Sequence, residues 1–125
     1  MAQEGRIGVL VVSHGPVASG MAQVANAIMG TEHAVGVDMN LWDTPAQMAE
    51  KTVDMARRVN QGKGCIVLAD MGSLLNVGQK IREETGMQVR VLPRTDTMMV
   101  VEAVRKTMWT DESLNEIADE LDKIK

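Results

Sequence analysis

Histidine is rare in this sequence, and one of its two copies directly follows an apolar run. His14 stands in the segment Ser13-His14-Gly15, after the run at positions 6–13. A neutral imidazole can act as a nucleophile or a general base near physiological pH, because one ring nitrogen carries a free electron pair. A histidine at the end of a strand can equally do no more than hydrogen-bond a neighbouring loop. The position of His14 alone leaves both interpretations open.

A carboxylate also ends an apolar run, because Asp70 closes the run at positions 65–70. A nucleophilic histidine needs its second ring nitrogen protonated and held, usually by a carboxylate or a carbonyl. If the Nδ1–H of His14 donates a hydrogen bond to Asp70, the other ring nitrogen, Nε2, would face a cleft at the end of the strands. Taken by itself, Asp70 is explained more simply as the N-cap of the helix expected over 73–84. The pair is more informative than either residue alone.

The residues that follow His14 and Asp70 could hold an anion. Gly72 and Ser73 offer backbone N–H groups at an expected helix N-terminus and a hydroxyl, which suit a phosphoryl group. Gly15 allows a bulky group to approach the backbone closely. Together these residues predict a site that accepts a phosphoryl group, where positioning and charge stabilisation carry most of the catalysis.

Other kinds of site fit the sequence less well. The segment SHGPVASG lacks the GxGxxG pattern of dinucleotide-binding domains, and no GxxxxGK[ST] pattern occurs. A response-regulator receiver also has an Asp after its third strand, but it needs an acidic pair after the first, where this chain has Ser13-His14. A metal site built from His14 and Asp70 would have two ligands and no Cys partner. We therefore expect neither a metal nor a cofactor.

The elements that must position these residues alternate along the chain. Apolar or alternating runs predict strands at 6–13, 34–41, 65–70 and 87–93. Helical spacing and capping residues predict helices at 17–30, 44–60, 73–84, 95–108 and 111–125. The order β-α-β-α-β-α-β-α-α predicts an α/β fold with a doubly wound, mostly parallel four-stranded sheet and helices on both faces.

In such a sheet the ligand site lies at the carboxyl ends of the strands, near the point where the strand order reverses. The segments that follow three of the predicted strands are 13–15, 70–73 and 94–96. We expect this fold to bring all three to one rim, and with them the candidate residues for chemistry.

Composition limits the class of protein. The 125 residues have a net charge of −4 and are 45% hydrophobic, which favours one globular domain over a disordered chain and argues against a surface that binds nucleic acid. No apolar run approaches the roughly 20 residues of a membrane helix, and the first residues lack signal-peptide features. Cys65 is the single cysteine, which excludes a disulfide framework. A cytoplasmic protein without membrane insertion is expected.

Three segments together resemble a known family. GVLVVSHGPVASGMAQVANAIMG, IVLADMGSLLNVGQKI and LPRTDTMMVVEAVRK are similar, in this order, to blocks of the mannose-type enzyme IIA domains of the bacterial phosphoenolpyruvate-dependent sugar phosphotransferase system. The likeness covers nearly the whole chain. It implies a phosphoryl carrier, in which His14 accepts a phosphoryl group from the phosphocarrier protein HPr, most simply on Nε2, and becomes a phosphohistidine.

The resemblance also implies roles for the other residues. Asp70 would orient the ring of His14, and Gly72 and Ser73 would help to hold the phosphoryl oxygens. Thr95 and Met98 are expected only as residues of the rim.

The segment ADMGSLLNVG indicates which subgroup of the family the chain is most similar to. Sugar-transporting members have a Trp-Gly-Gly-Ser-Pro type of turn there, whereas this chain is more similar to the enzyme IIA domains of LevR-type transcriptional activators. The alternatives are a IIA component for mannose- or fructose-type sugar transport, which would pass its phosphate to a IIB domain, and a DhaM-type donor to dihydroxyacetone kinase. A non-catalytic interaction module on the same fold is the alternative from another functional class.

The last residues depart from the transport members of the family. Those continue into a strand that swaps between the protomers of a homodimer, whereas positions 119–125 keep a helical pattern here. This leaves a swapped homodimer in doubt. It also leads to the expectation that residues 1–125 form a single domain taken from a longer regulator.

Overall fold

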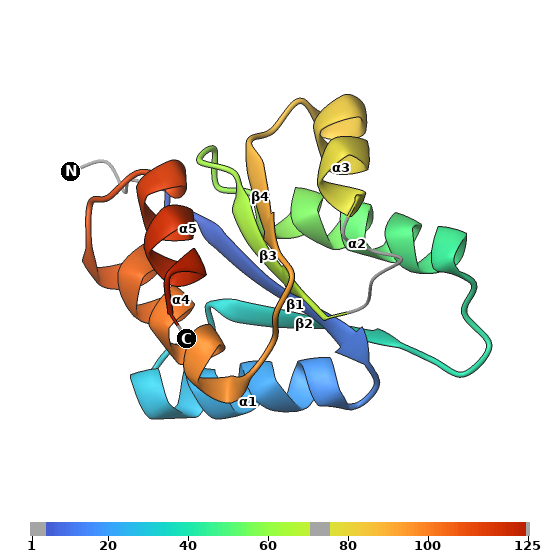
Figure 1. Cartoon of the computed structure of the whole chain (residues 1–125), viewed down its shortest axis with the longest axis horizontal. Coiled ribbons are helices and arrows are strands. Elements are labelled where there is room, and N and C mark those ends of the chain that lie inside the picture. The colour runs from blue at the N-terminus through green and yellow to red at the C-terminus, as the bar shows by residue number, and fades with distance from the viewer. Residues whose placement is uncertain (1–4, 71–75, 125) are drawn as a thin grey trace.

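Four parallel strands form one sheet, in the order β2-β1-β3-β4 (Figure 1). This computed structural model describes residues 5–70 and 76–124. The strands are β1 (Gly8–His14), β2 (Ala34–Met39), β3 (Cys65–Ala69) and β4 (Val89–Leu92). The helices are α1 (Val17–Met29), α2 (Pro45–Val59), α3 (Val77–Thr85), α4 (Thr97–Trp109) and α5 (Leu114–Asp122). The predicted order of elements and the doubly wound sheet are confirmed.

The sheet is buried on both faces, because helices cover each of them. In Figure 1, α1, α4 and α5 lie on one side of the sheet and α2 and α3 on the other. Side chains alternate along β1, so that Val9 and Val11 enter one core cluster while Leu10 and Val12 enter the other. This double burial explains why the sequence of β1 is apolar without interruption.

Local capping signals set most of the helix boundaries as predicted. Thr44 and Gln47 form a capping box before Pro45 at the start of α2. Gly30 ends α1 and Gly86 ends α3, each in the left-handed conformation, with φ of 68° and 73° respectively. Glycine adopts this conformation at little steric cost, which makes it a common helix terminator.

Two elements differ from their predicted bounds in ways that affect the site. The second strand ends at Met39 rather than at position 41, because Asn40 and Asp43 close a turn. The third helix begins at Val77 with Asn76 at its N-cap. Asn76, and not Asp70, is therefore the N-cap of α3, and positions 73–75, the predicted start of this helix, lie outside the described residues.

Helix α4 begins later than predicted. Thr95 lies before the helix, because Asp96 is its N-cap and accepts the Met99 N–H at 2.9 Å. Hydrogen bonding to this N–H, together with the nearby Arg94, holds the pKa of the Asp96 carboxyl below its usual value. The hydroxyl of Thr95 is thus left available for a contact at the rim.

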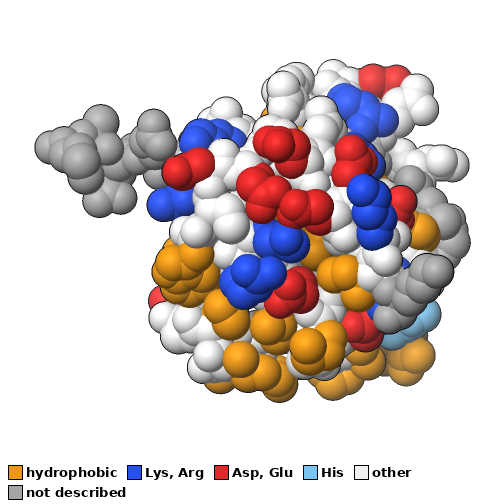
Figure 2. Space-filling model, turned by 60° about the vertical axis from the view of Figure 1, so that its left-hand side comes forward, with side chains coloured by type: hydrophobic (Ala, Val, Ile, Leu, Met, Phe, Trp, Pro, Cys, Tyr) orange, Lys and Arg blue, Asp and Glu red, His pale blue; other side chains and the backbone are white. Residues whose placement is uncertain are grey.

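The outer surface is uneven in character. Hydrophobic side chains gather along the lower edge of the molecule in Figure 2, where Figure 1 places α1, whereas charged side chains cover the region above. The sequence of α1 contains no charged residue, and Val17, Val24 and Ile28 are exposed on it. Within residues 5–70 and 76–124 no helix combines the length and the apolar composition needed to cross a membrane.

Candidate functional site

The carboxyl ends of β1 and β3 lie side by side at the point where the strand order reverses. From β1 the chain passes through α1 to β2 on one side, and then returns across β1 through α2 to β3 on the other. A sheet of this kind opens a crevice between the two strands whose connections leave in opposite directions. His14 ends β1 and Asp70 directly follows β3, so both predicted residues lie at this crevice.

Asp70 links the carboxyl ends of three strands through hydrogen bonds. Its Oδ2 accepts a hydrogen bond from the Ser13 hydroxyl at 3.0 Å and another from the Thr95 hydroxyl at 2.8 Å. Ser13 is buried, and its contact with Asp70 spans 57 positions of sequence. The bridge formed by Ser13, Asp70 and Thr95 therefore ties the ends of β1, β3 and β4 together.

The predicted hydrogen bond between His14 and Asp70 is not formed among the described residues. The register pairs Val12 with Ala69, which places Ser13 level with Asp70. Level residues of parallel strands project from the same face of the sheet, whereas consecutive residues project from opposite faces. Ser13 therefore meets the carboxylate, and His14 leaves β1 on the other face.

His14 lines an open hollow on the α2 side of the sheet. The hollow has a volume of about 540 Å³. Its lining residues belong to the end of β1 and to the loop after β2, namely His14, Gly15, Met39, Asn40, Leu41 and Trp42. His14 itself is exposed, which leaves the imidazole accessible to a reaction partner.

Gly15 has a steric role at this site. A Cβ atom on Gly15 would lie 2.8 Å from the Cβ of Asp38, closer than such atoms approach in proteins. The Asp38 carboxylate accepts the Ser19 N–H at 3.0 Å and so caps α1, whose own N-cap, Pro16, offers no side-chain hydrogen bond. Glycine at position 15 therefore lets β2 cap the helix that begins beside His14.

The remaining candidate residues are distributed unevenly. Thr95 belongs to the bridge with Asp70. Met98 is exposed near the start of α4, at the same end of the sheet. Gly72 and Ser73 lie outside the described residues, so their predicted contact with a phosphoryl group stays a prediction. Sequence reasoning missed Ser13, because its contact with Asp70 depends on the register between β1 and β3, which no local pattern in the sequence gives.

The other histidine and the cysteine have structural surroundings. His33 is partly buried, with Nε2 2.7 Å from the Ile7 carbonyl oxygen. Burial lowers its pKa, and the Ile7 carbonyl only partly offsets this effect. Cys65 is fully buried, which raises the pKa of its thiol to about 12 and keeps it protonated. Neither residue is placed for nucleophilic chemistry.

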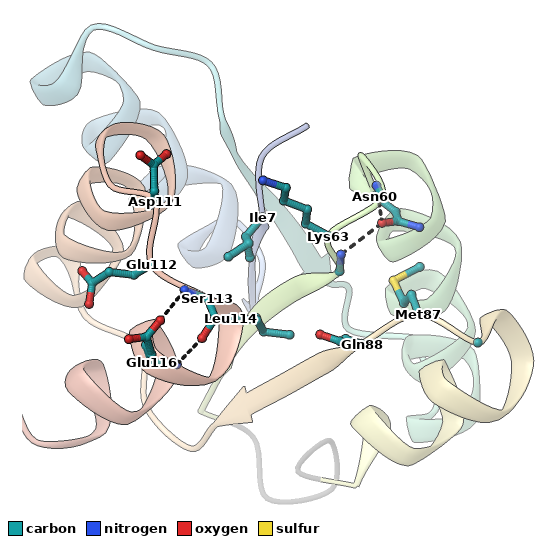
Figure 3. Close-up of a pocket in the computed structure, with 13 residues that line it drawn as sticks. Ile7, Asn60, Lys63, Met87, Gln88, Asp111, Glu112, Ser113, Leu114 and Glu116 are labelled. Atoms are coloured by element: carbon teal, nitrogen blue, oxygen red, sulfur yellow. Dashed lines mark hydrogen bonds between the residues drawn. The ribbon is translucent and has the colours of Figure 1, made fainter. Parts of the chain in front are cut away.

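A second hollow, of about 510 Å³, lies at the opposite end of the strands (Figure 3). Three of its polar side chains serve local structure. The Asn60 side chain accepts the N–H groups of Gly62 and Gly64, and Ser113 and Glu116 form the capping box of α5. In the described part of the chain no group of three or more His, Cys, Asp or Glu side chains could hold a metal ion. The combination of an exposed imidazole and a crevice is found at His14.

A family model described as "PTS system fructose IIA component", EIIA-man, matches residues 8–121. The chain belongs to the EIIA-man family. The match covers the sheet, the hollow at His14 and helices α1 to α4 in full, and it reaches into α5. The resemblance to mannose-type enzyme IIA domains is thereby confirmed.

Among curated proteins, this EIIA-man domain is similar to the transcriptional regulatory protein LevR of Bacillus subtilis (strain 168). The two are 33% identical over 119 residues, which make up 94% of this chain. The chain spans only 13% of the length of LevR. The similarity to LevR-type regulators predicted from the turn after Asp70 is confirmed.

Solved structures show the same arrangement. A sigma-54 interaction domain protein from Enterococcus faecalis superposes with a TM-score of 0.85 and 31% identity, over 95% of this chain and 90% of that one. The phosphotransferase system component EIIA from Streptococcus agalactiae gives 0.71 and 25%, over 92% and 88% of the two chains. The mannose/sorbose-specific IIA subunit from Enterococcus faecalis gives 0.75 and 22%, over 95% and 89%, and supports the fold alone.

Proposed function

We infer that this EIIA-man domain is a phosphoryl carrier that accepts a phosphoryl group from HPr on His14. The observation that carries the proposal is an exposed imidazole at the end of β1, beside the crevice of a doubly wound sheet, in a chain of this family. The unprotonated ring nitrogen, proposed to be Nε2, forms the bond to phosphorus. The bond between phosphorus and the donor breaks, and the donor atom keeps the electron pair.

The surroundings of His14 support this chemistry through position. Helix α1 begins three residues after His14, and the positive end of a helix dipole favours a phosphoryl group nearby. We assign Asp70 the part of a positioning residue, which acts on His14 through its chain neighbour Ser13. Gly72 and Ser73 are proposed to contact the phosphoryl oxygens.

We further infer that the domain serves in a transcriptional regulator in the cytoplasm, where phosphorylation of His14 would alter the activity of neighbouring domains. The identity of 33% with a segment of LevR, together with the TM-score of 0.85 to a sigma-54 interaction domain protein, supports this role over sugar transport. The alternative, a IIA component that passes its phosphate to a IIB domain, is supported by the similarity to EIIA of Streptococcus agalactiae.

Labelling with phosphoenolpyruvate, enzyme I and HPr tests the carrier function, because the chain has only two histidines. We expect the wild-type domain and a His33→Gln variant to acquire acid-labile label, and a His14→Gln variant to acquire none. His33→Gln is the matched control because it removes the other imidazole. Label on His14→Gln at the wild-type level would contradict the proposal, and no label on any protein would favour a non-catalytic interaction module.

A further inference from the structure

The loop between β2 and α2 exposes two large apolar side chains beside His14. Leu41 is 91% exposed and Trp42 is 85% exposed. Both line the same hollow as the imidazole. Among the described residues, the other exposed large apolar side chains, such as those along α1, do not line this hollow. Leu41 and Trp42 therefore share a surface with the candidate nucleophile.

The exposure of this pair is built into an ordered turn. The Asn40 N–H donates to Oδ2 of Asp43 at 2.8 Å, and the Asp43 N–H donates to the Asn40 carbonyl at 3.1 Å. Lys51 of α2 donates to the same Asp43 oxygen at 2.6 Å, and this contact lowers the pKa of the Asp43 carboxyl. Because the turn is held from both sides, docking there costs little ordering entropy.

A rigid, outward-facing tryptophan is typical of a protein-binding surface. Tryptophan is enriched among the residues that carry most of the binding energy in interfaces, since its ring buries a large area with few rotatable bonds. Placing an indole in water gains nothing for folding, because burial is what makes an apolar side chain stabilising. The sequence favours packing of Trp42 across its own loop over contact with a partner, and its exposure shows that this expectation is wrong.

The charges around the hollow indicate the kind of partner. Among the described residues that line it there is no Lys or Arg, and the nearby Lys51 is paired with Asp43. The Asp38 side chain packs against Gly15 and is not among the residues that line the hollow. A small anionic phosphoryl donor would find no cation in this hollow, whereas a protein donor can bring its own basic side chains together with an apolar surface.

We propose that Leu41 and Trp42 are the docking anchor for the phosphorylated donor protein, whose apolar surface with a basic rim covers the hollow while its phosphoryl group reaches His14. This assignment rests on the proposed function. In the transfer, the bond between phosphorus and the donor atom breaks, with the electron pair kept by the donor, as the bond to the His14 nitrogen forms. No further reactant is required. Leu41 and Trp42 contact the partner, not the reacting atoms, and so determine which donor is recognised.

Transfer from phosphorylated HPr to the domain tests the anchor, with Trp109→Ala as the matched control. Trp109 is the second tryptophan, 55% exposed at the end of α4, far from the loop. We expect Trp42→Ala to lower kcat/KM at least about tenfold, mainly through KM, which is the range of an interface hot spot. Trp109→Ala should leave kcat/KM unchanged. Phosphoramidate, a small donor, should label wild type and both variants at equal rates.

The outcomes separate the two proposals. Equal kcat/KM for Trp42→Ala and Trp109→Ala would overturn the docking anchor and leave phosphoryl transfer to His14 intact. Labelling by phosphoramidate but not by HPr would overturn both the donor and the anchor. A direct measurement uses a Trp109→Phe variant, in which Trp42 is the sole tryptophan, with a donor protein that lacks tryptophan. The emission of Trp42 should shift to shorter wavelength on binding, and transfer without a shift would contradict the proposal.

Discussion

Asp70 forms hydrogen bonds that link the strand ends of the rim, and within the described part of the chain it does not bind the imidazole of His14 directly. Both of its hydrogen bonds from hydroxyl groups fall on Oδ2, one from Ser13 in β1 and one from Thr95 after β4. Hydrogen bonds to a charged group are worth about 1.5–3 kcal/mol each, more than those between neutral groups. Since Ser13 is the residue before His14, the carboxylate limits how far the nucleophile can move.

Three substitutions distinguish an indirect role of Asp70 from a direct one. We expect Asp70→Asn to lower the rate of phosphoryl transfer about tenfold, which corresponds to about 1.4 kcal/mol of barrier, without unfolding the domain. If Asp70 acts through the bridge, Ser13→Ala and Thr95→Val should each reproduce part of this loss. The measurement is single-turnover labelling together with circular dichroism. An unchanged rate in Asp70→Asn would remove the residue from the mechanism.

At the scale of elements, helix α1 depends on β2 for both its position and its start. Asp38 of β2 caps the helix through the Ser19 N–H. Gly36 of β2 allows the helix to lie against the strand, because a Cβ there would be 2.5 Å from both the backbone N and the Cα of Ser19. The N-terminus of α1 next to His14 is thus placed by a strand that lies about twenty positions further along the chain.

A matched pair of glycine substitutions tests this close packing. Gly36→Ala should lower the free energy of unfolding by about 1–3 kcal/mol, since the added methyl group meets backbone that cannot move aside. Gly20→Ala should raise it by up to about 1 kcal/mol, because a Cβ there meets nothing within 4 Å and alanine favours a helix. Urea unfolding followed by circular dichroism measures both. Shifts in the same direction would contradict the packing argument.

At the scale of the whole molecule, the two cores on either side of the sheet leave little room for charge. Ser13, Thr52 and Thr107 are the buried polar residues among those described, and none of them is charged. Every buried side-chain nitrogen or oxygen in the described ranges has a hydrogen-bond partner. A group that gains charge inside this structure therefore reduces the stability of the whole domain.

His33 makes the stability depend on pH. Burial lowers its pKa below the ordinary value of 6.5, so the unfolded chain binds a proton more readily than the folded domain. The free energy of unfolding is therefore highest above about pH 6.5 and falls as the pH drops below it. Urea unfolding at pH 7.5 and 5.5 should show this loss in wild type and a smaller loss in His33→Gln. Equal losses would show that another group titrates.

The sequence predicted where the site lies, but it did not predict which of its residues are hydrogen-bonded to one another. Strand order placed His14 and Asp70 at one rim, and this holds in the structure. The hydrogen bond expected between them is absent among the described residues, because the register places Ser13, not His14, level with Asp70. Register depends on which residues of distant strands lie level, and a single apolar run does not encode that.

The sequence by itself determined the order of elements and most of the helix ends, because alternation, helical spacing and caps are local properties of the chain. Thr44 with Gln47, and Ser113 with Glu116, show that a capping signature a few residues long is enough. Only the tertiary structure decided that Trp42 faces solvent and that His33 is partly buried. Burial depends on which segments pack together, and those segments are far apart in the sequence.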